Sequence, residues 1–320
     1  MKQIVCFGEL LIDMISSNVG DLKDSEGFLK KFGGAPANTA VGLAKLGLSA
    51  KFIGKVGNDP FGLFLKEILD DNNVDTKNLI LSKKEKTSLA FVSLTETGER
   101  SFSFYKGAHD AISETEVSLL KSVYLFHFGS LTQISDGPKK ATEKLIKQAR
   151  KNKIIISYDP NIREALWVNL NKAKKIILET SKKVQIFKLN EEEAIFLSGE
   201  KNIPQAAEKL FTKNLDALFI TLGKNGCYYK TKKYKGQVSM PIKINVVDTT
   251  GAGDAFNAGY IYGIIQSKKT ISQMNQKDLE SILQKSNIIA GLTTTKKGAI
   301  TAFPSKHSLT KFIKQIALTL

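Results

Sequence analysis

The stretch DTTGAGDAF, residues 248–256, decides how this chain is interpreted. Gly251 and Gly253 allow a tight turn whose amide groups face one way. Residues 242–247 have the pattern of a strand and residues 255–265 that of an apolar helix, so the turn falls at a helix start. Unpaired amides and the positive end of the helix dipole converge at such a point. The stretch therefore predicts an anion-binding site suited to phosphate.

Asp254, directly beside this turn, predicts chemistry beyond binding. Phosphate repels a carboxylate, so its place there indicates a general base and not a phosphate ligand. A base held beside an anion hole is what transfer of a phosphoryl group to a hydroxyl requires. The stretch thus indicates a kinase for a small alcohol. The plainer alternative is a glycine turn in which Asp254 only complements the helix dipole.

Two common nucleotide-binding motifs are missing from the sequence. It contains no GxxxxGK[ST], and DTTGAGDAF does not satisfy GxGxxG because Phe256 holds the last position. Both P-loop kinases and Rossmann dehydrogenases are therefore disfavoured.

Outward from this stretch, apolar strand patterns alternate with helix patterns. The predicted strands are residues 3–8, 50–56, 123–128, 154–158, 184–189 and 217–221. The predicted helices are residues 36–46, 59–69, 138–151, 170–180, 191–198, 204–214 and 277–292. This alternation is typical of an α/β fold with a mainly parallel, doubly wound sheet flanked by helices.

Two segments interrupt the alternation. Alternating runs at residues 88–95 and 100–105, around a turn at residues 96–99, predict a hairpin. The weaker strand patterns of residues 10–32 interrupt the scheme near the N-terminus. We expect one domain over residues 1–320, with a small β-sheet lid formed by about residues 10–32 and 88–106.

Composition limits the classes of partner. The formal net charge is +16, but only Arg100, Arg150 and Arg163 are arginine, the residue that nucleic-acid recognition favours. The lysines are spread along the chain, which indicates a solvated surface and no nucleic-acid partner. No apolar run is long enough to span a membrane, and no signal peptide is evident. Cys6 and Cys227 lie in strand patterns, as buried thiols of a cytoplasmic protein would.

Two further segments accompany the opening stretch: GGAPAN at residues 33–38 and YDPNIREALW at residues 158–167. With them, the sequence resembles the ribokinase-like (PfkB) carbohydrate kinases over nearly its full length, and the fructokinase subgroup in particular. The resemblance implies a ribokinase-like fold and Mg²⁺-dependent transfer of phosphate from ATP to a sugar hydroxyl. The implied reaction converts D-fructose and ATP to fructose 6-phosphate and ADP.

The resemblance also implies roles for individual residues. Asp254 would be the general base, and the amides of Gly251, Ala252 and Gly253 the anion hole. Arg163 would reach both the sugar and the transferring phosphate. The implied sugar-binding residues are Asp13, Gly33, Gly34, Asn38, Arg163 and Asp254. A solvated acid at position 13 and helix capping at positions 33–38 are the plainer alternatives.

The remaining predicted residues are those expected to bind the nucleotide and metal ions. Asn190 and Glu193 form an NxxE motif that, by resemblance, orders Mg²⁺ through water, although helix-start chemistry would also explain it. The implied nucleotide-binding residues are Asn190, Thr221, Gly223, Gly226, Gly253, Asn287 and Gly298. The backbone carbonyls of Asp248 and Thr250 are candidates for a monovalent cation such as K⁺.

Several alternatives stay open. FYKGAHDAIS at residues 104–113 departs from the fructokinase pattern, with Lys106 where arginine is usual, and a lysine there could serve a carboxylated substrate. The rivals are therefore 2-keto-3-deoxygluconate kinase, followed by ribokinase or a nucleoside kinase. A kinase-like scaffold or basic nucleic-acid binder is the alternative from another class. Exposed lid strands need covering, so we expect a homodimer through the lid.

Overall fold

The computed structural model describes residues 2–94, 100–119 and 122–317. Its main sheet contains β1 (Gln3–Phe7), β4 (Ser49–Gly57), β5 (Asp75–Ser82), β8 (Val123–Phe128), β9 (Ile155–Tyr158), β10 (Ile186–Asn190), β11 (Ala217–Thr221), β12 (Cys227–Thr231) and β13 (Lys235–Val238). The strand order is β13-β12-β11-β10-β9-β8-β1-β4-β5. The strands from β11 to β5 are parallel, whereas β12 and β13 are antiparallel. Because β1 lies between β4 and β8, the chain builds the sheet in both directions from its first strand.

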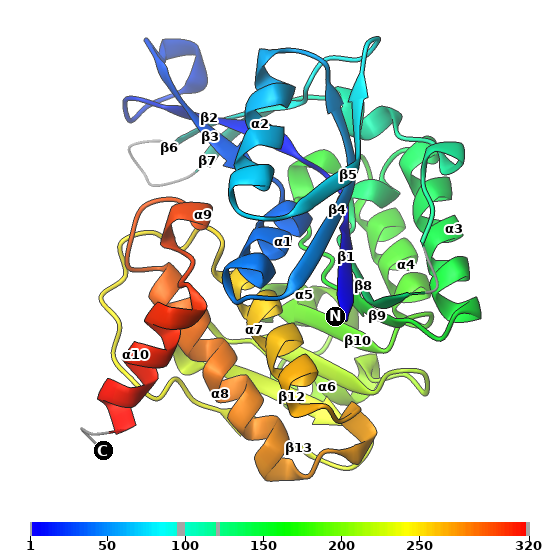
Figure 1. The fold of residues 1–320 in the computed structure, drawn as a ribbon, viewed down its shortest axis with the longest axis vertical. Helices are drawn as coiled ribbons and strands as arrows, with labels where there is room; N and C mark the ends of the chain where they lie inside the picture. Colours follow the sequence, from blue (N-terminus) through cyan, green and yellow to red (C-terminus); the bar gives the residue numbers. More distant parts are fainter. Residues whose placement is uncertain (1, 95–99, 120–121, 318–320) are drawn as a thin grey trace.

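Helices cover both faces of this sheet (Figure 1). They are α1 (Ala35–Lys45), α2 (Pro60–Asp71), α3 (Asp136–Lys151), α4 (Leu170–Ser181), α5 (Glu191–Ser198), α6 (Ile203–Leu210), α7 (Ala252–Ser267), α8 (Gln276–Thr293), α9 (Ala299–Ala302) and α10 (Lys306–Ala317). In Figure 1, α3 and α4 lie to the right of the strands, and α7, α8 and α10 to the lower left. Short 3-10 helices span Leu22–Asp24, Ala108–Ala111, Glu114–Glu116, Leu131–Gln133, Glu164–Leu166, Gly223–Asn225 and Ile271–Gln273.

The alternation of side chains along β1 explains why the protein has two cores. Ile4 and Cys6 belong to the core beneath α1, α2, α7 and α8. Val5 and Phe7 belong to the core that includes α3, α5 and α6. Successive residues of a strand point to opposite faces, so a strand buried on both faces is apolar throughout.

A second, smaller sheet has the order β3-β2-β6-β7. Its strands are β2 (Leu11–Ser16), β3 (Phe28–Gly33), β6 (Leu89–Leu94) and β7 (Arg100–Tyr105). The predicted hairpin is confirmed as the antiparallel pair β6–β7, and its turn at residues 96–99 lies outside the described residues. β2 and β6 pair in parallel, which joins the two segments expected to form the lid. The fold class predicted from the sequence is therefore confirmed.

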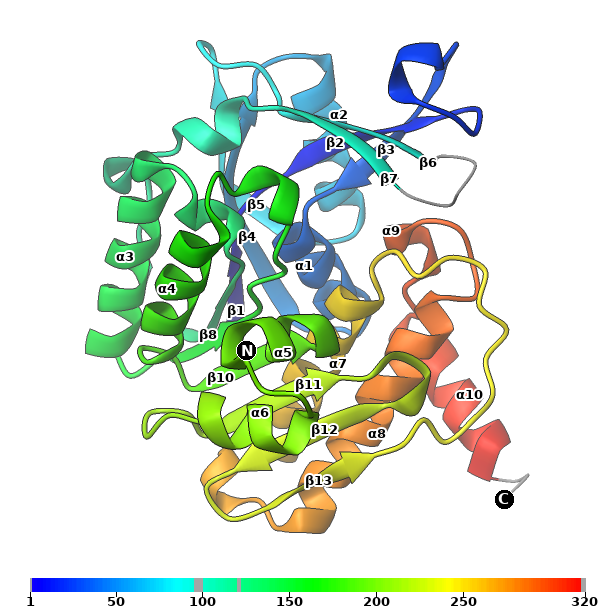
Figure 2. The same ribbon diagram turned by 180° about the vertical axis from the view of Figure 1, so that it is seen from behind.

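Two predicted elements differ from the structure. Residues 242–247 form no strand: they belong to the loop between β13 and α7, which is yellow in Figure 2, and Val246 and Val247 are 60% and 56% exposed. The chain leaves the sheet edge after β13 in order to reach α7, so this segment has no strand to pair with. The helix expected at residues 204–214 ends at Leu210, because Phe211 turns extended on the way to β11.

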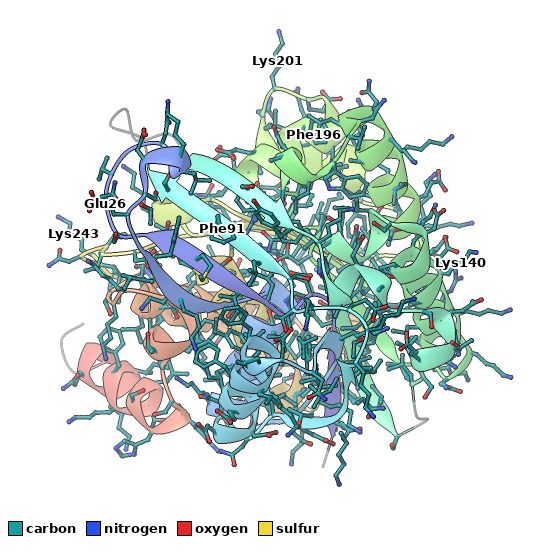
Figure 3. The ribbon with its side chains drawn as sticks, turned by 90° about the horizontal axis from the view of Figure 1, so that it is seen from above. Glu26, Phe91, Lys140, Phe196, Lys201 and Lys243 are labelled. Carbon is teal, nitrogen blue, oxygen red and sulfur yellow. The ribbon has the colours of Figure 1, made fainter. Side chains whose placement is uncertain are left out.

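Three exposed lysines come from distant parts of the chain. Lys140, Lys201 and Lys243 lie at well-separated points around the outline of the molecule (Figure 3). None of the described helices is long and apolar enough to cross a bilayer.

Candidate active site

A cavity of about 810 Å³ lies at the carboxyl ends of the parallel strands. Residues that follow or end five of these strands form part of its wall: Glu9, Ser130, Asp159, Asn190 and Thr221. The direction of sheet building reverses at β1, and such a switch point leaves a crevice where ligands bind. The predicted residues that line this first cavity are Asp13, Gly34, Asn38, Arg163, Asn190, Thr221, Gly223, Thr250, Gly251, Gly253 and Asp254.

The glycine turn lies at the start of α7, as predicted. Its two positions require glycine for different reasons. Gly251 has φ +80°, and a Cβ there would lie 2.4 Å from the Cβ of Ala299. Gly253 is helical, and its missing side chain instead leaves room for Lys188, whose Nζ lies 3.1 Å from the position of a Cβ. The amide of Ala252 donates to the carbonyl of Thr249 at 3.2 Å. This contact leaves the amides of Gly251 and Gly253 as the better candidates for binding an anion.

Asp254 stands in the first turn of α7 and is 7% exposed. The Nδ2 of Asn38, from α1, donates to its Oδ2 at 2.9 Å. Burial raises the pKa of Asp254 to about 7, against the lowering effect of the hydrogen bond from Asn38. A carboxyl group that titrates near neutral pH at the wall of a cavity suits general-base catalysis.

A buried ion pair beside Asp254 was missed by the sequence interpretation. Lys188 on β10 contacts Asp159, which follows β9, with 2.9 Å between Nζ and Oδ2. Asn257 on α7 donates to the same oxygen at 2.7 Å. Burial alone would lower the pKa of Lys188, but Asp159 and Glu193 raise it overall, so the ammonium stays charged. A lysine between the apolar residues Phe187 and Leu189 of this strand was the available signal.

Asp13 and Arg163, two of the predicted sugar-binding residues, line the same cavity as Asp254. Burial raises the pKa of Asp13 to about 6, opposed by the nearby charge of Arg163. The Nη1 of Arg163 donates to Oδ1 of Asn161 at 2.7 Å. Gly33 does not appear among the residues lining the cavity, and a Cβ there would lie 2.4 Å from Oδ2 of Asp13. Gly33 therefore makes room for Asp13, whereas Gly34 lies on the wall itself.

Glu9 is a second residue that the sequence interpretation missed. Its Oε1 accepts a hydrogen bond from the amide of Ala35 at 2.9 Å, and its Oε2 has no partner among the described residues. Burial raises its pKa to about 7, although backbone hydrogen bonds oppose this. An unpaired buried oxygen on a cavity wall is a candidate contact for a substrate hydroxyl.

Asn190 and Glu193 form a capping box at the start of α5. The carboxylate of Glu193 accepts from the amides of Ile162 at 2.7 Å and Asn190 at 2.8 Å. Both carboxylate oxygens thus serve the backbone, so the helix-start explanation holds and a direct metal bond is disfavoured. Asn190, Glu191 and Glu192 line the cavity, and this set of oxygen donors fits Mg²⁺ that keeps most of its water ligands. Among the described residues, no group of three or more acidic, histidine or cysteine side chains forms a ready metal cage.

A second cavity of about 760 Å³ adjoins the first, and Thr221, Gly223, Thr249 and Gly253 line both. The predicted nucleotide residues Gly226 and Asn287 lie on its wall, together with Ala252. Asn287 also has a structural role, because its Nδ2 donates to the carbonyl of Val238 at 3.0 Å. Two cavities that share residues of the glycine turn fit a ligand with a base at one end and phosphates at the other.

Asp248, Thr250 and Gly298 form a separate cluster. The Oδ1 of Asp248 accepts from the amide of Thr250 at 2.9 Å, and its Oδ2 from the amide of Gly298 at 2.8 Å. Gly298 does not appear among the residues that line either cavity. The nucleotide role of Gly298 and the cation role of the Asp248 and Thr250 carbonyls therefore stay predictions.

Comparison with known proteins agrees with this geometry. The family model described as "pfkB family carbohydrate kinase" matches residues 1–306. Probable fructokinase-2 of Arabidopsis thaliana is 39% identical over 317 residues, covering 97% of this chain and 95% of the relative. Fructokinase from Xylella fastidiosa with bound ATP has a TM-score of 0.90 at 28% identity, covering 98% and 99% of the two chains.

Two structures of fructokinase from Vibrio cholerae O395 each have a TM-score of 0.86 at 28% identity. One contains fructose, ADP and calcium and covers 98% of this chain and 99% of its own. The other, a double mutant, contains fructose, ADP and potassium and covers 98% of each chain. The match of the family model and the identity to a fructokinase over nearly the whole length lead to one conclusion: this chain belongs to the pfkB family of carbohydrate kinases.

Proposed function

We propose that this enzyme is a fructokinase, which transfers the terminal phosphoryl group of ATP to D-fructose and releases fructose 6-phosphate and ADP. The observation that carries the proposal is Asp254, a buried carboxyl at the cavity wall in the helix turn that Gly251 opens. The relatives with bound fructose and ADP support the choice of substrate.

In the proposed reaction, Asp254 accepts the proton of the sugar hydroxyl as the hydroxyl oxygen bonds to phosphorus. The bond from phosphorus to the oxygen of ADP breaks on the opposite side. The amides of Gly251 and Gly253 face the phosphoryl oxygens and stabilise their charge. Asn190 and Glu191 would hold hydrated Mg²⁺, which offsets phosphate charge when it is bound.

The small sheet supplies the sugar side and excludes water. Asp13 on β2 and Phe102 and Phe104 on β7 line the same cavity as Asp254. With Asn38 and Arg163, Asp13 would bind the sugar hydroxyls. Apolar rings in the cavity wall would help to exclude water, so that the phosphoryl group passes to the sugar hydroxyl and not to water.

The position of Lys106 bears on the rival substrates. Its Nζ contacts Oδ2 of Asp110 at 3.5 Å and donates to Oγ of Ser135 at 3.1 Å. Lys106 is not among the residues lining the first cavity. Recognition of a carboxylated sugar such as 2-keto-3-deoxygluconate by this lysine is therefore disfavoured, which favours a neutral sugar.

A coupled assay of ADP release tests the function directly. We expect the highest kcat/KM with fructose, compared with 2-keto-3-deoxygluconate, ribose and adenosine. Asp254→Asn should lose nearly all turnover while still binding fructose and ATP. Asp278→Asn is the matched control, because this partly exposed carboxylate pairs with Lys269 and does not line either cavity. Equal turnover in Asp254→Asn and the wild type would contradict the assignment of the base. Salt-sensitive nucleic-acid binding without sugar-dependent ADP release would favour the other class of function.

We further propose a homodimer in which the small sheet of one chain covers that of the other. The edge strands of this sheet are β3 and β7, and Leu29 and Tyr105 on them are 57% and 61% exposed. Unpaired sheet edges and exposed apolar side chains favour association.

A cytoplasmic location is proposed from the two buried free thiols, Cys6 and Cys227. Binding of K⁺ at the Asp248 and Thr250 carbonyls is proposed with the potassium-containing relative as its support.

A further inference from the structure

Lys188 has an unusual position for a lysine. It lies in the middle of β10 between the fully buried Phe187 and Leu189, and it is only 5% exposed. An ammonium taken out of water costs several kcal/mol unless its charge is compensated. Lys188 nevertheless lines the first cavity, so its charge faces the space where the substrates meet.

The partners of Lys188 leave part of its hydrogen-bonding capacity unused. Among the described residues, its one hydrogen-bond acceptor is Oδ2 of Asp159, at 2.9 Å. Asn257 donates to this same oxygen, whereas Oδ1 of Asp159 is buried without a partner. An ammonium has three donors. Two of them therefore remain for a ligand in the cavity, while Asp159 and Asn257 fix the position of the nitrogen.

The geometry of the glycine turn shows where those donors lie. The Nζ of Lys188 is 3.1 Å from the position that a Cβ of Gly253 would occupy. The ammonium thus sits against the first turn of α7, beside the amides that we assign to phosphate and one residue from Asp254. A fixed cation at this point faces the oxygen atoms on which negative charge accumulates during phosphoryl transfer.

We propose that Lys188 is a further catalytic residue, which binds the phosphoryl group in transfer, and that Asp159 is the positioning residue that holds it. The proposal rests on the proposed kinase function. Lys188 keeps its proton throughout: the hydroxyl proton goes to Asp254, the new bond joins the sugar oxygen to phosphorus, and the bond to ADP breaks. The ammonium only offsets charge, and the dry surroundings strengthen its effect.

The first test is Lys188→Met, which keeps most of the length of the unbranched side chain and removes its charge. We expect kcat to fall roughly 10²–10³-fold, as for loss of one oxyanion-hole donor, with little change in the KM for fructose. The matched control is Lys55→Met. Lys55 is also buried, at 8% exposed, and pairs with Glu116 at 3.1 Å, but it does not line either cavity. A kcat loss of the same size in both variants, or a kcat of Lys188→Met within threefold of the wild type, would overturn the proposal.

The double variant Lys188→Met, Asp159→Asn guards against misfolding, because it removes both charges of the pair. We expect its melting temperature to recover relative to Lys188→Met while kcat stays low. Recovery of kcat together with stability would mean that the pair is only structural, and would overturn the proposal.

Restoring the ammonium provides a third readout. Lys188→Cys, alkylated with 2-bromoethylamine, regains a side chain with an ammonium at nearly the length of lysine. We expect kcat to rise at least tenfold, whereas alkylation with iodoacetamide should leave it unchanged. Equal effects of the two reagents would contradict a role for the charge. A wild type without sugar-dependent ADP release would instead refute the kinase function, so the two failures are distinguishable.

Discussion

Replacement of Asp254 by asparagine should abolish catalysis and at the same time stabilise the fold at alkaline pH. Burial raises the pKa of this carboxyl from 3.8 to about 7. Between these two pH values the native state keeps a proton that the unfolded state has already lost. The free energy of unfolding therefore falls as the pH rises through this window. Each pH unit costs about 1.4 kcal/mol, so the charged carboxylate costs on the order of 4 kcal/mol above pH 7.

Asparagine has nearly the same shape and no charge at any pH, and its Oδ1 can still accept the hydrogen bond from Asn38. The stability difference between Asp254→Asn and the wild type should thus grow by about 2 kcal/mol between pH 5.5 and pH 8.0. Urea unfolding with linear extrapolation at the two pH values measures it. Glu9 and Asp13, whose pKa values are also raised, titrate in both proteins and cancel to first order in the difference.

Asp278→Asn is again the matched control. Its hydrogen bond with Lys269 lowers the pKa of Asp278 below the usual value, so this carboxyl is ionised at both pH values and its replacement should have the same effect at each. An equally pH-independent difference for Asp254→Asn would refute the reasoning, since it would mean that the folded state leaves the pKa of Asp254 near 3.8.

Three further outcomes follow from the geometry. In the wild type, kcat/KM should fall about tenfold for each pH unit below 7, because Asp254 must be unprotonated to act as base; a profile flat to pH 5 would contradict this. Gly251→Ala should lower the melting temperature, because an alanine is strained at φ +80° and its Cβ would lie 2.4 Å from the Cβ of Ala299. Gly253→Ala should instead mainly lower kcat, because its Cβ would displace Lys188. Equal melting temperatures for the two glycine variants would be the contrary result. If the proposed dimer forms, Leu29→Glu on the small sheet should convert it to a monomer in light scattering, and an unchanged mass would argue against that interface.

Much of the fold followed from patterns that are local in the sequence. Period-two and period-3.6 patterns fix strands and helices wherever one face must be buried, and residues 191–198 and 217–221 have the predicted bounds. The loop at residues 242–247 shows the limit of this reasoning. Its alternation of polar and apolar residues satisfies a strand pattern, but a strand also needs a neighbour to pair with. Only the order of strands in the finished sheet decides whether such a neighbour exists.

The candidate site divides in the same way. Asp254, Asn38 and Arg163 belong to recognisable motifs, and all three line one cavity. Lys188 and Glu9 carry no motif, and their importance comes from what the fold places beside them. A single lysine in an apolar strand has many explanations until Asp159, from another strand, is seen to neutralise it. Pairings between distant segments of this kind are not contained in the spacing of residues along the chain.

The hydrogen bond between Asn38 and Asp254 joins residues 216 positions apart. During synthesis, the segment that carries Asn38 leaves the ribosome long before the segment that carries Asp254. The early part of the chain, which includes most of the sugar side, is therefore produced without a base. If Asp254 is the base, a chain that ends before α7 would lack it, and the proposed site would be complete only once α7 packs against α1.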